Sequence, residues 1–141
     1  MYNYNDYLLN NYFKKTTPNM RENQPTLYNP TEAYNRGNLF SNLYDSYKNY
    51  QPTELNASNE QDALYLEYAR MAFSAHELNL YLDLNPDDTT MLALFNDYRS
   101  KANELMTKYE KEYGPLTVAS DNSSSTFLWK KQPWPWEGEN I

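Results

Sequence analysis

Few side chains in this chain could perform chemistry. His76 is the only histidine, and there is no cysteine. A Ser-His-Asp or Cys-His nucleophilic arrangement therefore has little support, and disulfides and thiolate metal sites are excluded. The three glycines form no phosphate-binding loop. We therefore predict that the protein is not an enzyme, with no catalytic residues and no bound cofactor.

A carboxylate metal site is the remaining possibility. His76 is followed by Glu77 and, further along, by Asp83, Asp87 and Asp88. A di-metal site in a helix bundle needs two Glu-x-x-His pairs and two further glutamates, and this chain has no Glu-x-x-His. The adjacent aspartates instead suit the positive end of a helix dipole. We predict no metal ligands, and we place His76 on a helix surface.

The strongest candidates for binding are aromatic. All three tryptophans lie near the end of the chain, two of them in the run Pro133-Trp134-Pro135-Trp136. Proline favours an extended backbone here, and large exposed rings usually need a surface that covers them. Either this tail packs back over the chain's own helices, or it docks onto a partner protein. The first group of predicted partner-binding residues is Trp129, Trp134 and Trp136.

The beginning of the chain is rich in tyrosine and asparagine. Residues 1–30 hold five of the 15 tyrosines and are interrupted by prolines. With few aliphatic side chains to offset the ordering entropy, this stretch is predicted to be a disordered arm. Its tyrosines either reflect local composition or form oxidative dityrosine links in an assembly.

Residues 31–57 are predicted to be a short helical segment and a linker. Pro30 can begin a helical turn that Gly37 ends. Apolar side chains then recur at three- and four-residue spacings, which indicates a second amphipathic turn, and Pro52 ends it. Such short pieces are unstable alone in water. The second group of predicted partner-binding residues comes from this turn: Phe40, Tyr44 and Tyr47.

Residues 58–114 carry the strongest helical signals. Ser58 and Gln61 match a capping box, with serine as the cap of the first helix. Apolar side chains then follow in alternating steps of four and three residues, as expected for a helix with one buried seam. The first seam is Leu64, Tyr68, Met71, Ala75, Leu78 and Leu82, and the second is Met91, Phe95, Tyr98, Ala102, Leu105 and Tyr109.

The residues between these seams indicate a tight connection. Asn85 suits a helix cap, Pro86 the first helical position, and the two aspartates after it the first turn. Gly114 is predicted to end the second helix in a left-handed cap, followed by Pro115. A connection of about two or three residues forces the helices to be antiparallel.

The predicted fold class is therefore mainly α, an antiparallel two-helix hairpin between extended or disordered aromatic-rich arms. Residues 115–141 form the last region, a serine-rich linker and the tryptophan-proline tail. A two-helix pair buries few side chains for its length. We therefore expect the hairpin to recruit the aromatic arms, a second copy or another protein.

The charge distribution limits the classes of partner. The formal net charge is −7, and residues 58–113 hold eleven acidic and five basic residues. Nucleic acid is excluded as an expected partner because phosphate binding needs clustered lysine and arginine. The acidic helices are either a solvated surface or a surface for a basic partner. No apolar run approaches the ~20 residues that span a bilayer, and no signal peptide is recognised, so we expect no membrane insertion and no Sec-type export.

Several motifs occur in an order that resembles the CotJB family of endospore coat proteins. They are the run from Glu77 to Asp83, Asn85-Pro86-Asp87-Asp88, the run from Glu112 to Leu116, and the Pro-Trp-Pro-Trp-Glu end. The resemblance covers about residues 58–141. A shorter stretch is similar to the CotJA proteins of the same operon, although Ser46 stands where that family tends to have proline. It comprises Glu32-Ala33, Gly37, Leu39-Phe40, Leu43-Tyr44-Asp45 and Tyr47.

The resemblance implies a structural component of the bacterial spore coat, synthesised in the mother-cell cytoplasm. It also implies packing with CotJA-like proteins and with CotJC-like proteins, which are similar to manganese catalases, and self-association is possible as well. The alternative is an accessory subunit that handles manganese for such an enzyme. That role would require metal bound by His76, Asp87 and Asp88.

Overall fold

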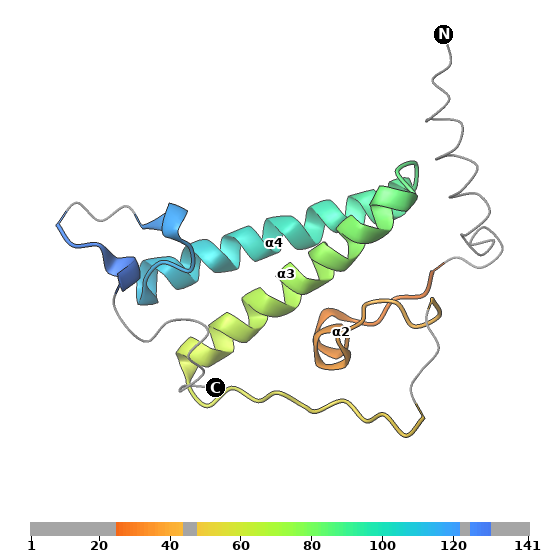
Figure 1. Ribbon diagram of the computed structural model, residues 1–141, viewed down its shortest axis with the longest axis horizontal. Helices are drawn as coiled ribbons and strands as arrows, with labels where there is room; N and C mark the ends of the chain where they lie inside the picture. Colours follow the sequence, from red (N-terminus) through yellow and green to blue (C-terminus); the bar gives the residue numbers. More distant parts are fainter. Residues whose placement is uncertain (1–24, 44–47, 122–124, 131–141) are drawn as a thin grey trace, which may run out of the picture.

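The structure is a computed structural model that describes residues 25–43, 48–121 and 125–130. Two long helices, α3 (Glu60–Leu84) and α4 (Thr89–Tyr113), pack against each other as an antiparallel pair, and a short helix, α2 (Pro30–Arg36), packs against α3 (Figure 1). Two 3-10 turns follow α4, η1 (Val118–Ser120) and η2 (Leu128–Lys130). The predicted mainly α hairpin is confirmed.

Most of the predicted arms lies outside the described residues. This holds for residues 1–24 of the N-terminal arm and for residues 131–141 of the tail. Their extended or disordered state therefore stays a prediction, as does the division of the chain into four regions.

The start of α3 differs by one residue from the predicted cap. Asn59, not Ser58, is the N-cap, and its side-chain oxygen accepts a hydrogen bond from the Asp62 backbone N–H at 2.8 Å. The Asp62 carboxylate accepts one in return from the Ser58 backbone N–H at 3.3 Å. The arrangement resembles a capping box, but the Asp62 carboxylate bonds the backbone N–H of the residue before the cap and the Asn59 side-chain amide at 3.0 Å. Gln61, the predicted third position, instead donates to the Tyr109 hydroxyl across the hairpin at 2.9 Å.

The connection between the long helices is also longer than predicted. Asn85 caps the end of α3, with its backbone N–H and its side-chain amide both donating to the Tyr81 carbonyl at 3.1 Å. The N-cap of α4 is Asp88, whose carboxylate accepts from the Met91 backbone N–H at 3.0 Å and from the Tyr81 hydroxyl at 3.1 Å. Asp88 thus links the two helices, because its carboxylate bonds a residue of each. Asn85 caps only the end of α3 and is not the cap of α4. Pro86 therefore precedes α4 rather than opening it.

Gly114 ends α4 in the predicted place but not in the predicted conformation. Its φ of 112° is positive, whereas its ψ of 173° is extended and not that of a left-handed helical cap. The Gly114 backbone N–H still donates to the Glu110 carbonyl at 3.1 Å. Glycine is suited to this position because side chains strongly disfavour such a φ.

The short helix α2 forms where the sequence predicts it. Asn29 is its N-cap, Pro30 is its first residue, and Gly37 ends it in the left-handed conformation with φ 68° and ψ 26°. The Asn29 side chain accepts from the Glu32 backbone N–H at 2.9 Å. Proline at the start and glycine just past the end are the usual asymmetry of helix termini.

The second predicted turn is wrong in its described part, because Leu39 to Leu43 are not helical. Phe40 instead forms an isolated antiparallel bridge with Leu27, and the Tyr28 backbone N–H donates to the Leu39 carbonyl at 2.9 Å. This pairing provides hydrogen-bond partners for backbone groups of residues 39–41, which a helical turn would otherwise have provided. Residues 25–43 thus close on themselves around α2, and we call them the docked segment.

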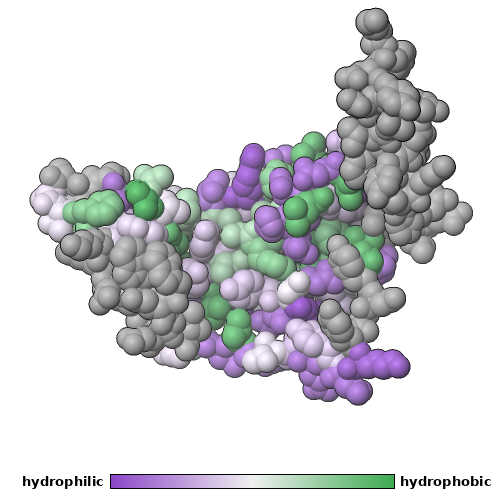
Figure 2. All heavy atoms as spheres, viewed as in Figure 1, coloured by the Kyte–Doolittle hydropathy of each residue, from purple (hydrophilic) through white to green (hydrophobic). Residues whose placement is uncertain are grey.

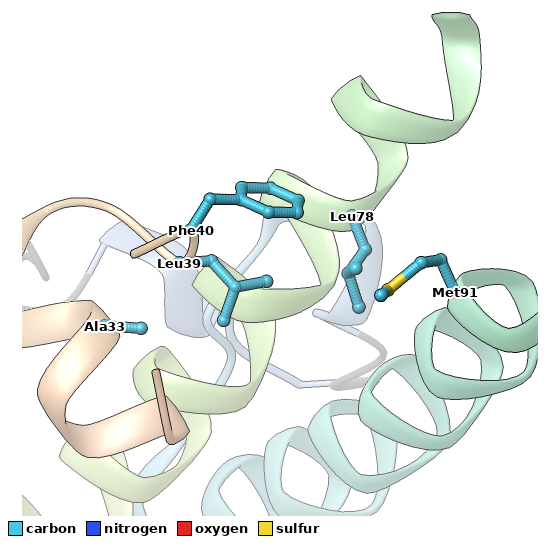
Figure 3. Close-up of a cluster of buried hydrophobic side chains, with 5 residues drawn as sticks. All are labelled: Ala33, Leu39, Phe40, Leu78 and Met91. Atoms are coloured by element: carbon cyan, nitrogen blue, oxygen red, sulfur yellow. The ribbon is translucent and has the colours of Figure 1, made fainter. Parts of the chain in front are cut away.

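The hydrophobic core lies where the docked segment meets the hairpin, close to the α3–α4 connection. Its buried members come from three elements: Ala33, Leu39 and Phe40 from the docked segment, Leu78 from α3, and Met91 from α4 (Figure 3). Leu39 and Leu78 have no exposed surface. The Phe40 ring packs against the Tyr81 ring with centroids 5.3 Å apart. The core therefore depends on residues outside the hairpin.

Helix α3 consequently packs on two faces. The predicted seams are confirmed for the contact with α4, because Leu64, Ala75, Leu78, Met91 and Ala102 are buried. A second face of α3 contacts the docked segment and was not predicted. It includes Phe73 and Tyr81, and Leu66 shares this face by its spacing and is 4% exposed. These three residues are seven and eight positions apart, so they give a weaker sequence signal than the first seam, whose residues recur every three or four positions.

We predict that Phe40→Ala lowers the free energy of unfolding by about 3–5 kcal/mol, because it leaves a cavity between the docked segment and α3. Urea unfolding followed by circular dichroism measures this change. The control is Phe127→Ala, because Phe127 is 57% exposed and such substitutions usually change stability by less than about 0.5 kcal/mol. Equal effects of the two substitutions would contradict the described core.

Asp88→Ala is predicted to lower the free energy of unfolding by about 0.5–2 kcal/mol, because it removes the N-cap of α4. Asp88→Asn should retain most of this stability, since asparagine is an equally good cap. The neighbouring Asp87 is exposed, so Asp87→Ala serves as the matched control. A control effect as large as that of Asp88→Ala, in the same unfolding assay, would argue against the cap.

Candidate partner-binding surfaces

Phe40 belongs to the chain's own core and not to a free surface. It was predicted to bind a partner protein, but it is only 3% exposed and packs on Tyr81. The physical reason is that the docked segment already covers the second face of α3. Of the other predicted residues, the structure describes Trp129, whereas Tyr44, Tyr47, Trp134 and Trp136 lie outside the described residues.

Polar contacts fix the docked segment on α3. The Leu39 backbone N–H donates to the Glu77 carboxylate at 3.3 Å. The Tyr34 ring meets the Phe73 ring edge-on, with centroids 5.9 Å apart. Hydrogen bonds and ring contacts of this kind give direction to a contact that hydrophobic burial alone would leave adjustable.

The chain after the docked segment also follows α3. The Arg70 guanidinium donates to the Leu55 carbonyl at 3.3 Å, and the Tyr50 hydroxyl donates to the Arg36 carbonyl at 3.4 Å. The residues before α3 therefore return along this helix to reach its start, as the extended trace in Figure 1 shows. The result is that α3 lies between α4 and the docked segment.

Trp129 lies in a short folded region beyond α4. It is half-buried in η2, and its backbone N–H donates to the Asp121 carboxylate at 2.8 Å. The Leu116 backbone N–H donates to the Glu110 carboxylate at 2.9 Å, which turns the chain at the end of α4. Nearby in the sequence, Val118 and Phe127 are more than half exposed. This region thus presents apolar groups just before the tryptophan-proline tail.

Other exposed apolar side chains lie near the connection of the hairpin. Leu80 and Leu84 share one face of α3 and are about half exposed, and Leu92 lies in the first turn of α4. In the view of Figure 2, hydrophobic residues are mixed with hydrophilic ones and form no single broad patch outside the grey atoms. The described surface therefore offers several small apolar contacts.

Four tyrosines meet at the open end of the hairpin, where α3 begins and α4 ends. The ring centroids of Tyr65 and Tyr109, on different helices, are 5.8 Å apart. Tyr65 lies 6.1 Å from Tyr68, and Tyr109 lies 5.2 Å from Tyr113. The predicted seams contained Tyr68 and Tyr109 but missed the other two. Tyrosine pairs spaced by three and by four residues, at the ends that an antiparallel hairpin brings together, are the signal that could have found them.

The environment of Tyr65 keeps its hydroxyl protonated. Burial raises the pKa of Tyr65, and the neighbouring phenols of Tyr34, Tyr68 and Tyr109 raise it further. A phenol with a raised pKa is neutral at physiological pH. Tyr65 therefore takes part in the cluster as a neutral phenol.

The residues considered for metal chemistry do not come together. His76 is exposed on α3, which confirms its predicted place on a helix surface, and Asp87 is exposed while Asp88 caps α4. Within residues 25–43, 48–121 and 125–130, no three histidine, cysteine or acidic side chains are grouped so that they could hold a metal ion. Among the same residues, no helix has the length and apolar character to cross a membrane.

The family comparison covers the hairpin and the tail. The family model described as CotJB protein matches residues 62–137, which include nearly all of α3, the whole of α4 and both 3-10 turns. The docked segment lies outside this match. Comparisons with curated proteins and with solved structures found no match. Because the family model matches more than half of the chain, this protein belongs to the CotJB family of spore coat-associated proteins.

Proposed function

We propose that this protein is a structural component of the endospore coat that acts by packing with other CotJ proteins. The observation that carries the proposal is the docking of residues 25–43 on α3, because it identifies a face of a CotJB hairpin that accepts an aromatic segment from outside the family region. A chain built from such contacts is suited to assembly. We further propose synthesis in the mother cell and incorporation into the coat.

The identity of the docked residues supports a CotJA-like partner. The residues that resemble CotJA proteins include those that make this contact: Ala33 and Leu39 are fully buried and Phe40 is 3% exposed. Gly37 ends α2 in the conformation that brings Leu39 and Phe40 back to the hairpin. We propose that the docked segment is a covalently attached form of a CotJA–CotJB contact.

The C-terminal region is the proposed contact for a CotJC-like protein, which is similar to manganese catalases. Trp129 is half-buried in this region, and the exposed Phe127 lies two residues before Trp129. Aromatic side chains of this kind are the usual anchors of protein interfaces. Trp134 and Trp136 continue this region in the sequence, with Tyr44 and Tyr47 as further candidates in the N-terminal part.

The described residues do not favour the alternative role in manganese handling. His76 and Asp87 are exposed at separate positions, and the carboxylate of Asp88 is bonded to the Met91 backbone and to Tyr81. We therefore propose a non-catalytic protein that uses no cofactor of its own. Self-association through the exposed apolar side chains would be compatible with this role.

Co-expression with the CotJA-like and CotJC-like chains tests the proposal. A tagged chain should co-purify with the CotJC-like protein, and the double variant Trp134→Ala/Trp136→Ala should lose it while circular dichroism shows unchanged helix content. The control is His76→Ala, which should retain the complex, because His76 is exposed on α3 away from the tail in sequence.

Three results would oppose parts of this proposal. Loss of helix content in the double variant would show that the tail completes the chain's own core. Loss of bound manganese together with the complex in His76→Ala would favour metal handling. A monomeric wild-type chain that co-purifies with neither CotJ protein would overturn the proposal as a whole.

A further inference from the structure

We propose that the four-tyrosine cluster at the open end of the hairpin is a site of oxidative cross-linking, at which Tyr65 of α3 and Tyr109 of α4 become covalently joined. This inference is independent of the proposed partners. It rests on ring contacts within one chain. The proposed modification site lies on α3 and α4, in the part of the chain that matches the family model, and does not involve the N-terminal tyrosines.

The geometry selects this pair. Coupling is favoured for two tyrosyl radicals whose rings already lie in contact, and the Tyr65 and Tyr109 ring centroids are 5.8 Å apart with a tilt of 60°. The pair joins different helices, so packing of α3 on α4 holds the rings together rather than a local turn. The Gln61 side-chain amide donates to the Tyr109 hydroxyl oxygen at 2.9 Å, which restrains that ring further.

The cluster also provides a way for an oxidant in solution to reach the pair. Tyr113 is 39% exposed, and its ring lies 5.2 Å from that of Tyr109. A radical formed on Tyr113 can therefore oxidise Tyr109 through adjacent rings. Tyr68 extends the contact on the other side, 6.1 Å from Tyr65. The half-buried pair is thus connected to an exposed entry residue.

The proposed reaction is a two-electron oxidation by a peroxide, through a peroxidase that removes one electron at a time. Each phenol loses one electron and its hydroxyl proton. A carbon–carbon bond then forms between ring carbons next to the hydroxyl groups, and the two ring protons at those carbons move to the phenolic oxygens as aromaticity returns. The protein loses two electrons and two protons overall, and one hydrogen peroxide is reduced to two waters.

The product would join the two helices at the end that the α3–α4 connection leaves open. A cross-link that closes a long loop reduces the conformational freedom of the unfolded chain, as disulfides do in the chain-entropy model. This chain has no cysteine, so no disulfide can serve this purpose in its hairpin.

Mild oxidation of the full-length protein with horseradish peroxidase and hydrogen peroxide tests the proposal. Trypsin cleavage at Lys48, Arg70, Lys108 and Lys111 separates peptide 49–70, which holds Tyr65, from peptide 109–111, which holds Tyr109. Mass spectrometry should find these two peptides linked with the loss of two hydrogen atoms, and fragmentation should locate the link at Tyr65. In monomeric, folded protein, the Tyr65–Tyr109 link should be the most abundant dityrosine link. When oxidation is done in urea, it should no longer be more abundant than the other links.

Matched variants separate this site from general tyrosine oxidation. Tyr113→Phe keeps the ring but removes the exposed phenol, and it should slow formation of the link several-fold. Tyr98→Phe is the control on the same helix, because no contact between Tyr98 and another tyrosine ring is described, and it should not change the rate. An equal yield of the link in urea, or links confined to tyrosines outside the cluster, would overturn the proposal.

Discussion

The contact on which the described structure depends is the burial of Leu39 and Phe40 against the second face of α3. A pair of helices in contact along one seam leaves the opposite face of each helix in water. Here α3 carries apolar side chains on both faces, so α4 alone could not cover it. The docked segment supplies the missing cover and holds the buried residues Leu39 and Phe40 beside Leu78 and Tyr81. The hairpin becomes a three-part structure because one helix has two apolar faces.

The two ends of the hairpin are stabilised by different means. At the connection, Asp88 caps α4 and receives the Tyr81 hydroxyl, and the aliphatic core lies close by. At the open end, Asn59 caps α3, and a row of tyrosine rings lies beside the buried Leu64. Tyrosine brings large apolar area together with a hydroxyl that accepts water or a hydrogen-bond donor. It is therefore suited to an end of the structure where burial is incomplete.

The sequence predicts the hairpin well because its signals are local. Periodic apolar residues, proline at Pro30 and glycine at Gly37 and Gly114 act within one or two helical turns, and the structure has helices in those places. The caps were misplaced by one to three residues because Ser58, Asn59, Asn85 and Asp88 are all competent caps. Tertiary bonds such as that from Tyr81 to Asp88 decide among them. The role of Phe40 could not be read locally, since its bridge to Leu27 and its contact with Tyr81 join distant parts of the chain.

The covalent connection between the docked segment and α3 fixes the stoichiometry of these two parts. Only residues 44–59 separate the docked segment from the first residue of α3. A short tether turns docking into an intramolecular event with an effective concentration on the order of millimolar. A contact whose Kd between separate chains is well below millimolar is then formed in nearly every molecule. The ratio of the two parts is fixed at one to one by translation, and it does not change with the amount of either part that the cell makes.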